Sequence, residues 1–323
     1  MVEEALVHIE FTRVDSTLGQ AVLSGAFGSK LIYLYGSEDQ KRRYLPRVLN
    51  GDAVMYAAFT EPGHGSDITR LSTRVTRRGE RWIINGSKTF ITNAPIADFG
   101  IILCQGEYAG DKPYRHQYMF IVENDMQGVK VREMKGKMGQ RGSPIGEIIL
   151  NNVEVGDDAL LGEEGRGFYQ ALTFFNHGRV RAASNGIGMA LGAIDRAIKY
   201  AGDRVQFDRR IIEFQAVSHK IAVMIQYIEA AKLLTLRAAW MIDRGLDPRM
   251  VSVASAIAKR YSSEAASWIA DQAIQIHGGY GYMSDIDLER RYRDIRVLRI
   301  YEGTSEILNE VIIGGVARGD YPI

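Results

Sequence analysis

The chain has 323 residues, of which 46% are hydrophobic and 24% are charged; this is the composition of a folded globular protein with room for about two domains. Forty Lys and Arg residues against 39 Asp and Glu residues leave a net charge of +1, so no overall field attracts nucleic acid or an anionic membrane. No stretch approaches the about 20 apolar residues of a membrane span, and the acidic start MVEEALVHIE is unlike a targeting peptide. We therefore expect a cytoplasmic protein with no membrane span and no nucleic-acid partner.

The cysteine and histidine content argues against metal chemistry. Cys104 is the single cysteine, and the six histidines show no metal-binding spacing such as HExxH. We predict that the protein has no metal site.

Residues 1–50 have the pattern of helices. In the segment EDQKRRYL, Glu38 precedes Arg42 by four residues and Asp39 precedes Arg43 by four residues. This spacing favours ion pairs along one face of a helix.

From about residue 54 to 160 the pattern changes to the two-residue alternation of strands. Two apolar runs, 81–84 and 88–91, flank the dipeptide Asn85-Gly86, and this arrangement predicts a β-hairpin. Further strands are expected at 101–103, 118–122 and 147–150.

Helical periodicity returns from about residue 165 to the end of the chain. Apolar residues recur at helical spacing from Ile221 to Ala231, and Gly245 is expected to end that helix. Many alanines follow, and small side chains allow helix axes to approach closely. The pattern predicts a helix bundle.

Two segments of this region invite a nucleotide interpretation that their residues do not support. The glycine-rich segment 186–192 has Leu191 where the fingerprint G-x-G-x-x-G requires its third glycine, so we expect close helix packing instead. The arginines between 290 and 299 alternate with acidic residues, and we expect a solvated, salt-bridged helix face there.

Two glycine-rich loops hold candidate functional residues. The loop FTEPGHGSD at 59–67 is either a tight turn or a loop whose hydroxyl and N–H groups bind a polar cofactor ring. Its His64, Ser66 and Asp67 lie too close in sequence to form a catalytic triad. The segment QIHGGYGY at 275–282 is either a helix C-cap or backbone exposed to a diphosphate or to another subunit.

Glu302 is the strongest candidate for an acid–base group. It stands in IYEGTSEI, just before a helix that Thr304 or Ser305 would cap. Burial there would raise the pKa of the carboxyl group into the range of a useful base. The alternative is an acidic residue in the first turn of a helix, without a chemical role.

Taken in order, these segments resemble the acyl-CoA dehydrogenase family of flavoproteins. The resemblance extends from about residue 15 to 316 and rests on FTEPGHGSD, and on QIHGGYGY followed by the arginine-rich run and YEGTSE. It implies an α+β fold with a partial N-terminal helical domain, a middle β-barrel or β-sandwich domain and a C-terminal four-helix bundle; we assign these to residues 1–53, 54–162 and 163–323. It also implies a homotetramer, built as a dimer of dimers, with FAD between the β domain and the bundle.

The resemblance implies α,β-dehydrogenation of an acyl-CoA thioester to the trans-2-enoyl-CoA. The β-hydrogen would pass to FAD, and the electrons then to an electron-transfer flavoprotein. Glu302 matches the family's catalytic base, and Gly178 stands at the position from which some relatives supply the base instead. The N–H of Glu302 would polarise the thioester carbonyl, and Gly303 would let side chain and amide both face the substrate.

The remaining site residues follow by position from the same resemblance. The expected cofactor-binding residues are Phe59, Thr60, Phe90, Ile91, Thr92, Arg204, Phe207, Gln215, Gln275, Gly278, Gly279, Thr304 and Glu306, with Arg204 at the diphosphate. The expected substrate-binding residues are Ser66, Asn176, Arg179, Tyr301 and Gly303.

Alternatives stay open within this resemblance. An acyl-CoA oxidase or an enoyl-CoA reductase would use the same scaffold, and a non-catalytic subunit or assembly factor would keep the fold alone. The sequence does not determine the length or branching of the acyl group. Because family members begin earlier, we expect either an upstream start or a shortened version, which would leave Leu23, Phe27 and Leu31 without their usual cover.

Overall fold

The computed structural model describes residues 1–322, which form two compact units. The helical unit consists of residues 1–20, 138–141 and 175–322, and the β unit consists of residues 21–137 and 142–174. Within residues 1–322, no helix is both long enough and apolar enough to cross a membrane.

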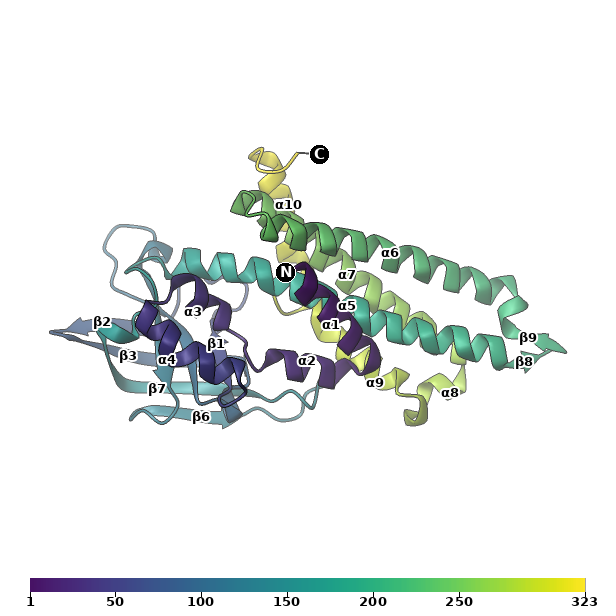
Figure 1. Ribbon diagram of the computed structural model, residues 1–323, viewed down its shortest axis with the longest axis horizontal. Helices are drawn as coiled ribbons and strands as arrows, with labels where there is room; N and C mark the ends of the chain where they lie inside the picture. Colours follow the sequence, from purple (N-terminus) through teal and green to yellow (C-terminus); the bar gives the residue numbers. More distant parts are fainter. Residues whose placement is uncertain (323) are drawn as a thin grey trace. The chain divides into compact units, whose positions relative to one another are not determined.

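The β unit contains a seven-stranded sheet in the order β1-β4-β2-β3-β7-β6, with β5 paired to β4 (Figure 1). The pairs β1–β4 and β2–β4 are parallel and the others are antiparallel. The strands are β1 Met55–Ala58, β2 Arg74–Arg78, β3 Arg81–Thr92, β4 Phe99–Gln105, β5 Gln117–Glu123, β6 Val129–Glu133 and β7 Ile145–Gly156.

The predicted hairpin at Asn85-Gly86 is wrong, because this dipeptide lies inside the continuous strand β3. The β2–β3 hairpin turns instead at residues 79–80, between the paired residues Arg78 and Arg81, and Gly79 there has φ +60°. Asn85-Gly86 instead coincides with a register shift between β3 and β7. Gly86 has φ +148°, and a Cβ there would overlap the backbone of Thr73. The flexible dipeptide therefore makes a β-bulge rather than a chain reversal.

Two helices of the β unit precede the sheet: α3 Ser29–Tyr35 and α4 Glu38–Leu49. A capping box of Ser37 and Gln40 starts α4. The expected i,i+4 ion pairs are not formed. Lys41 pairs with Glu38 at 2.9 Å and Arg42 pairs with Asp39, both three residues apart, since that spacing also lies on one helix face.

The sequence predicted that Leu23, Phe27 and Leu31 would be uncovered, but the exposed apolar side chains of this part of the β unit are mainly their neighbours. Leu31 is fully buried, whereas Leu23 and Phe27 are half-buried. Val22 and Leu34 are exposed instead, by 65% and 40%.

The helical unit is a bundle in which α5, α6 and α7 lie side by side (Figure 1). Ile187 of α5, Met224 of α6 and Ile269 of α7 are fully buried in one core cluster. The helices of the chain outside the β unit, or shared with it, are α1 Val2–Val14, α2 Ser16–Ser24, α5 Gly167–Asp203, α6 Gln215–Asp243, α7 Pro248–His277, α8 Gly279–Tyr282, α9 Leu288–Ile295 and α10 Ser305–Ala317, with the short strands β8 Val205–Gln206 and β9 Arg209–Arg210.

The glycines of segment 186–192 serve helix packing, as predicted. A Cβ on Gly188 would overlap the backbone carbonyl of Ile9, and one on Gly192 would overlap that of Arg13. Helix α1 therefore approaches α5 to backbone contact distance. The interruption at Leu191 is irrelevant to this role, because packing needs small residues on one face and not a phosphate-binding turn.

The predicted solvated arginine face of residues 290–299 is only partly correct. Arg293 pairs with Glu289 at 2.8 Å near the surface. Arg291, in contrast, is fully buried and donates a hydrogen bond to the Val14 carbonyl at 2.5 Å. This arginine joins α9 to the end of α1, because a guanidinium group can satisfy several backbone carbonyls at once.

Candidate active site

Glu302 lies in the loop between a 3₁₀ turn, Arg296–Arg299, and helix α10. Its φ is +54° and that of Gly303 is +89°, so two consecutive residues have left-handed backbone. This conformation costs a non-glycine residue of order 1–3 kcal/mol and is found mostly at functional sites. Thr304 caps α10 by accepting a hydrogen bond from the Ile307 N–H at 3.2 Å. Glu302 is therefore outside the helix, and the first-turn alternative does not apply.

The carboxyl group of Glu302 has a buried oxygen, Oε2, without a hydrogen-bond partner within residues 1–322. Burial raises the pKa of Glu302, while the nearby cations Arg179, Lys259 and Arg181 act in the opposite direction, and burial has the larger effect. A carboxyl group with a raised pKa and a free acceptor oxygen is suited to take a proton from a weak carbon acid.

Gly178 of α5 provides the space that the Glu302 side chain occupies. A Cβ at position 178 would lie 2.7 Å from Cδ of Glu302. Any side chain at 178 would therefore displace the carboxylate from its present position. The two alternative base positions of the family resemblance exclude each other sterically in this chain.

Arg179 is the second buried charge of the site, with 6% of its surface exposed. Its Nη1 donates to Asn176 Oδ1 at 3.3 Å and to Ser252 Oγ at 3.2 Å. Burial lowers the pKa of Arg179 to about 10, although the charge of Glu302 acts in the opposite direction. The Nε donor has no partner within residues 1–322 and can serve a ligand. The adjacent His177, for which the sequence indicated no role, is buried.

Tyr301, the residue directly before Glu302, is held by polar side chains. Its hydroxyl group is hydrogen-bonded to Gln140, Asn185 and Gln20, and burial raises the pKa of the phenol. Gln140 in turn donates to Asp294, a buried carboxylate. These polar contacts hold the side chain of Tyr301, the residue directly before Glu302.

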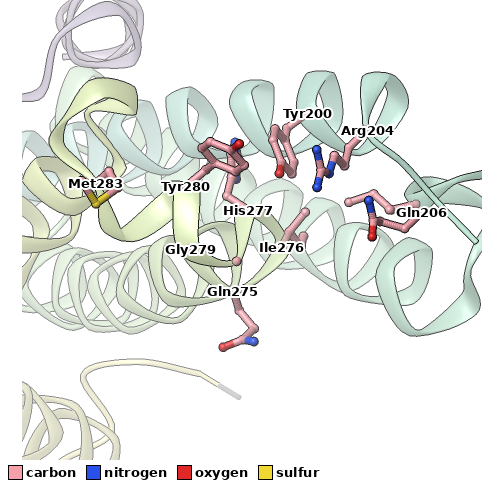
Figure 2. Close-up of a pocket in the computed structure, with 11 residues that line it drawn as sticks. Tyr200, Arg204, Gln206, Gln275, Ile276, His277, Gly279, Tyr280 and Met283 are labelled. Atoms are coloured by element: carbon pink, nitrogen blue, oxygen red, sulfur yellow. The ribbon is translucent and has the colours of Figure 1, made fainter.

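A second feature of the helical unit is a cavity of about 530 Å³ near the α5–α6 and α7–α8 connections. Arg204 and Tyr200 border it from α5 and the loop that follows, and the segment from Gln275 to Gly279 borders it from α7 and α8 (Figure 2). Gly278 has φ +59°, and no atom lies within 4 Å of a Cβ built on Gly278 or Gly279. The cavity thus combines an arginine with open backbone, which suits a phosphate-containing ligand.

Three other predicted residues of the helical unit, Phe207, Gln215 and Glu306, lie outside this cavity's lining. Phe207 has φ +51° in the β8–β9 turn and is 89% exposed. Gln215 begins α6 and Glu306 lies in the first turn of α10, and both are exposed. Gln275 borders the cavity, but its amide points away from Arg204 (Figure 2).

In the β unit, the two predicted cofactor segments are joined by contacts that the sequence did not reveal. Lys88 is fully buried, and its Nζ donates to the Phe59 carbonyl at 3.0 Å and to Glu61 at 2.8 Å. The Thr89 N–H donates to the Thr60 carbonyl at 2.9 Å. These contacts place the 59–61 loop against Lys88 and Thr89 of strand β3. The predicted cofactor-binding segment, residues 90–92, follows directly in the same strand.

The predicted residues of these segments differ in exposure. Phe59 and Ile91 are buried, Thr60 and Thr92 are half-buried, and Phe90 is 62% exposed with φ +59°. In the segment that follows, residues 62–67, Ser66 is exposed. His64 contacts Ser72 at 3.1 Å, consistent with the exclusion of a triad within the loop.

The main residue that sequence reasoning missed in the helical unit is Lys259 of α7. It is fully buried, and its Nζ donates to the Gly303 carbonyl at 2.5 Å. The signal was a lone lysine among small residues of a helix, ASAIAKRYSS. Helical spacing alone did not indicate which face of α7 points inward at that position.

Comparison with known proteins agrees with these observations. Residues 1–52, 57–153 and 165–316 match the models of the acyl-CoA dehydrogenase N-terminal, middle and C-terminal domains. The chain is 40% identical to the 3-(aryl)acrylate reductase of Clostridium sporogenes over 88% of this chain and 74% of that protein. It is also 40% identical to the caffeyl-CoA reductase-Etf complex subunit CarC of Acetobacterium woodii, over 94% of this chain and 79% of that subunit.

A solved structure gives the same result for the fold. The butyryl-CoA dehydrogenase of Megasphaera elsdenii superposes with a TM-score of 0.92 at 32% identity, covering 97% of this chain and 81% of that one. The α+β fold expected from the sequence is confirmed. The chain belongs to the acyl-CoA dehydrogenase family, whose members are FAD-dependent oxidoreductases acting on CH–CH groups.

Proposed function

We propose that this protein catalyses the α,β-dehydrogenation of an acyl-CoA thioester to the trans-2-enoyl-CoA, with Glu302 as the base that removes the α-proton. The observation that carries the proposal is the Glu302 carboxyl group itself. One of its oxygens is buried and has no hydrogen-bond partner within residues 1–322, and burial raises its pKa. Glu302 and Gly303, both with left-handed backbone, precede helix α10, so their N–H groups are not part of its hydrogen-bond ladder.

The residues present fit an FAD cofactor. The open backbone of Gly278 and Gly279 and the guanidinium group of Arg204 would hold the diphosphate in the cavity of the helical unit. In the β unit, Phe59, Thr60 and the segment Phe90–Thr92 would contact the flavin ring. When bound, FAD accepts the β-hydrogen as hydride.

Each protein group then has a defined task. The ionised Glu302 carboxylate takes the α-proton, and the electron pair of that C–H bond forms the new double bond as the β-hydride leaves. The Glu302 N–H donates to the thioester oxygen, where negative charge develops. Arg179, with a free Nε donor, contacts the CoA part of the substrate. Asn176 orients Arg179 through the contact at 3.3 Å.

The test is Glu302→Gln in the flavin-loaded protein. The amide has nearly the same shape but cannot accept the proton, so we expect turnover to fall by at least ~100-fold, with the flavin spectrum and bound FAD unchanged. Oxidation of a panel of acyl-CoA substrates, followed by flavin bleaching, provides the measurement and also identifies the acyl group. Near-normal turnover of the variant would remove Glu302 as the base.

A second candidate is the reverse reaction, reduction of an enoyl-CoA. Two relatives at 40% identity are named as reductases, and by reversibility the protonated Glu302 would then donate to the α-carbon. Reoxidation of chemically reduced protein by enoyl-CoA substrates, compared with its reduction by acyl-CoA substrates, distinguishes the preferred direction.

We further propose an electron-transfer flavoprotein as the redox partner and a homotetramer as the assembly. The CarC relative is a subunit of a reductase-Etf complex. Peroxide yield with and without an added electron-transfer flavoprotein separates this partner from direct transfer to oxygen. Sedimentation of the purified protein tests the tetramer.

A further inference from the structure

Lys259 lies in α7 with none of its surface exposed. A fully buried lysine is rare because the charged form loses its hydration, so such a residue needs a compensating partner. Burial lowers the pKa of Lys259 to about 8, and the charge of Glu302 acts against this effect. Helix α7 thus keeps a cation at a fully buried position, where its charge is costly.

The hydrogen bond of Lys259 is directed at the backbone of the active-site loop. Nζ donates to the carbonyl of Gly303 at 2.5 Å. That carbonyl belongs to the second of the two consecutive residues with left-handed backbone, Glu302 and Gly303. An anchored carbonyl there restrains the peptide that aims the Glu302 side chain and N–H, and compensates part of the conformational cost of the loop.

Lys259 is one of three cations whose charges act on Glu302. Glu302 faces Arg179 and Arg181 of α5 and Lys259 of α7. Arg179 also donates to Asn176 and Ser252. Arg181 pairs with Glu4 of α1.

The other acidic groups near Lys259 are engaged or exposed. Glu264, on the same helix, pairs with Arg299 at 2.9 Å and accepts from Ser305 at 2.6 Å. Glu306 of α10 is exposed to solvent. Glu302 is thus the carboxylate on which the charge of Lys259 acts most strongly.

We propose that Lys259 is a positioning residue for the base: its hydrogen bond to Gly303 fixes the left-handed loop, and its charge favours the ionised carboxylate of Glu302. The inference rests on the proposed function, since it takes Glu302 as the base. It separates two contributions, a donor to the carbonyl and a positive charge, which different substitutions remove.

Three variants of the full-length, flavin-loaded protein separate these contributions. Lys259→Met removes donor and charge, Lys259→Gln keeps a donor without the charge, and Lys259→Arg keeps both. Lys232→Met is the control, because Lys232 pairs with Glu229 at the surface of α6. Flavin absorbance and thermal unfolding identify any variant that fails to fold.

The decisive readout is the acid limb of kcat against pH. Loss of a nearby positive charge raises the pKa of a carboxyl group, so we expect this limb to move upward by about one pH unit in the Met and Gln variants. Lys259→Arg should restore it. At pH values above the limb, Lys259→Met should remain on the order of 10-fold slower than Lys259→Gln, because only the Gln variant can still donate to Gly303. KM should change little.

The results discriminate between the two proposals. An unmoved acid limb in a folded Met or Gln variant would overturn the role of Lys259 while leaving Glu302 as the base. Near-normal turnover of Glu302→Gln would instead overturn the base assignment. If both hold, adding Lys259→Met to Glu302→Gln should cause no further loss, because the positioned group is already absent.

Discussion

At the scale of single residues, the site depends on conformations and charges that are costly elsewhere in a protein. Glu302 has left-handed backbone and a buried carboxyl oxygen without a partner within residues 1–322. Arg179 and Lys259 are buried cations on neighbouring helices. Each is unfavourable alone, but the cations partly offset the buried carboxylate. Their combination places two cations beside the carboxyl group of Glu302.

A prediction at this scale concerns Gly178. Its replacement by alanine would place a Cβ 2.7 Å from the carboxyl carbon of Glu302 and force the base to move. We expect kcat to fall at least ~10-fold, because a displacement of about 1 Å costs up to 100-fold in rate. FAD content should be unchanged. The measurement is steady-state kinetics with flavin quantification, and an unchanged kcat would show that the base can occupy another position.

At the scale of elements, glycines decide how closely helices and strands approach. On α5, Gly188 faces the α1 backbone, whereas no atom lies within 4 Å of a Cβ on Gly202 near the end of the same helix. On β3, Gly86 faces Thr73 and forms a bulge instead of the expected turn. The same residue type therefore has different roles, which the neighbouring element sets.

This difference gives a matched pair of substitutions. Gly188→Ala would introduce an overlap with the α1 backbone and should lower the free energy of unfolding by about 1–3 kcal/mol. Gly202→Ala meets no neighbour and should be neutral or stabilising by up to about 1 kcal/mol, because alanine is the better helix former. Urea unfolding of both variants measures the difference. Equal effects would mean that α1 and α5 separate without cost.

At the scale of the whole molecule, two compact units each hold part of the predicted cofactor-binding residues. The near-zero net charge gives no general attraction for an anionic ligand, so binding has to come from local groups. We propose that Arg204 and the open glycines that line the cavity of the helical unit are such groups. Ligand binding at such groups stabilises the folded chain by mass action.

A final prediction tests this linkage. FAD at 100 times its Kd should stabilise the folded protein by about 2.7 kcal/mol, which raises the melting temperature. Arg204→Ala should weaken FAD binding by about 10- to 100-fold, since it removes a charged hydrogen-bond donor. Arg244→Ala, at the exposed end of α6, is the control. Thermal scans across FAD concentrations provide the measurement, and equal FAD dependence in both variants would contradict the role of Arg204.

The sequence determined the kind of chain and the order of its parts, because hydrophobic periodicity and turn residues are local properties. The end of α6 just before Gly245 and the cap of α10 by Thr304 were readable in this way. The YEGT motif also pointed to Glu302 through the family resemblance; the family comparison supports that resemblance, and the role of Glu302 as the base stays a prediction.

The tertiary structure decided which residues surround those motifs. The cations facing Glu302 come from α5 and α7, and the carbonyl bound by Lys259 lies 44 residues away in sequence. Burial of Arg291 and the bulge at Gly86 depend likewise on distant segments. Desolvation and charge pairing are properties of three-dimensional neighbours, so no local pattern can specify them.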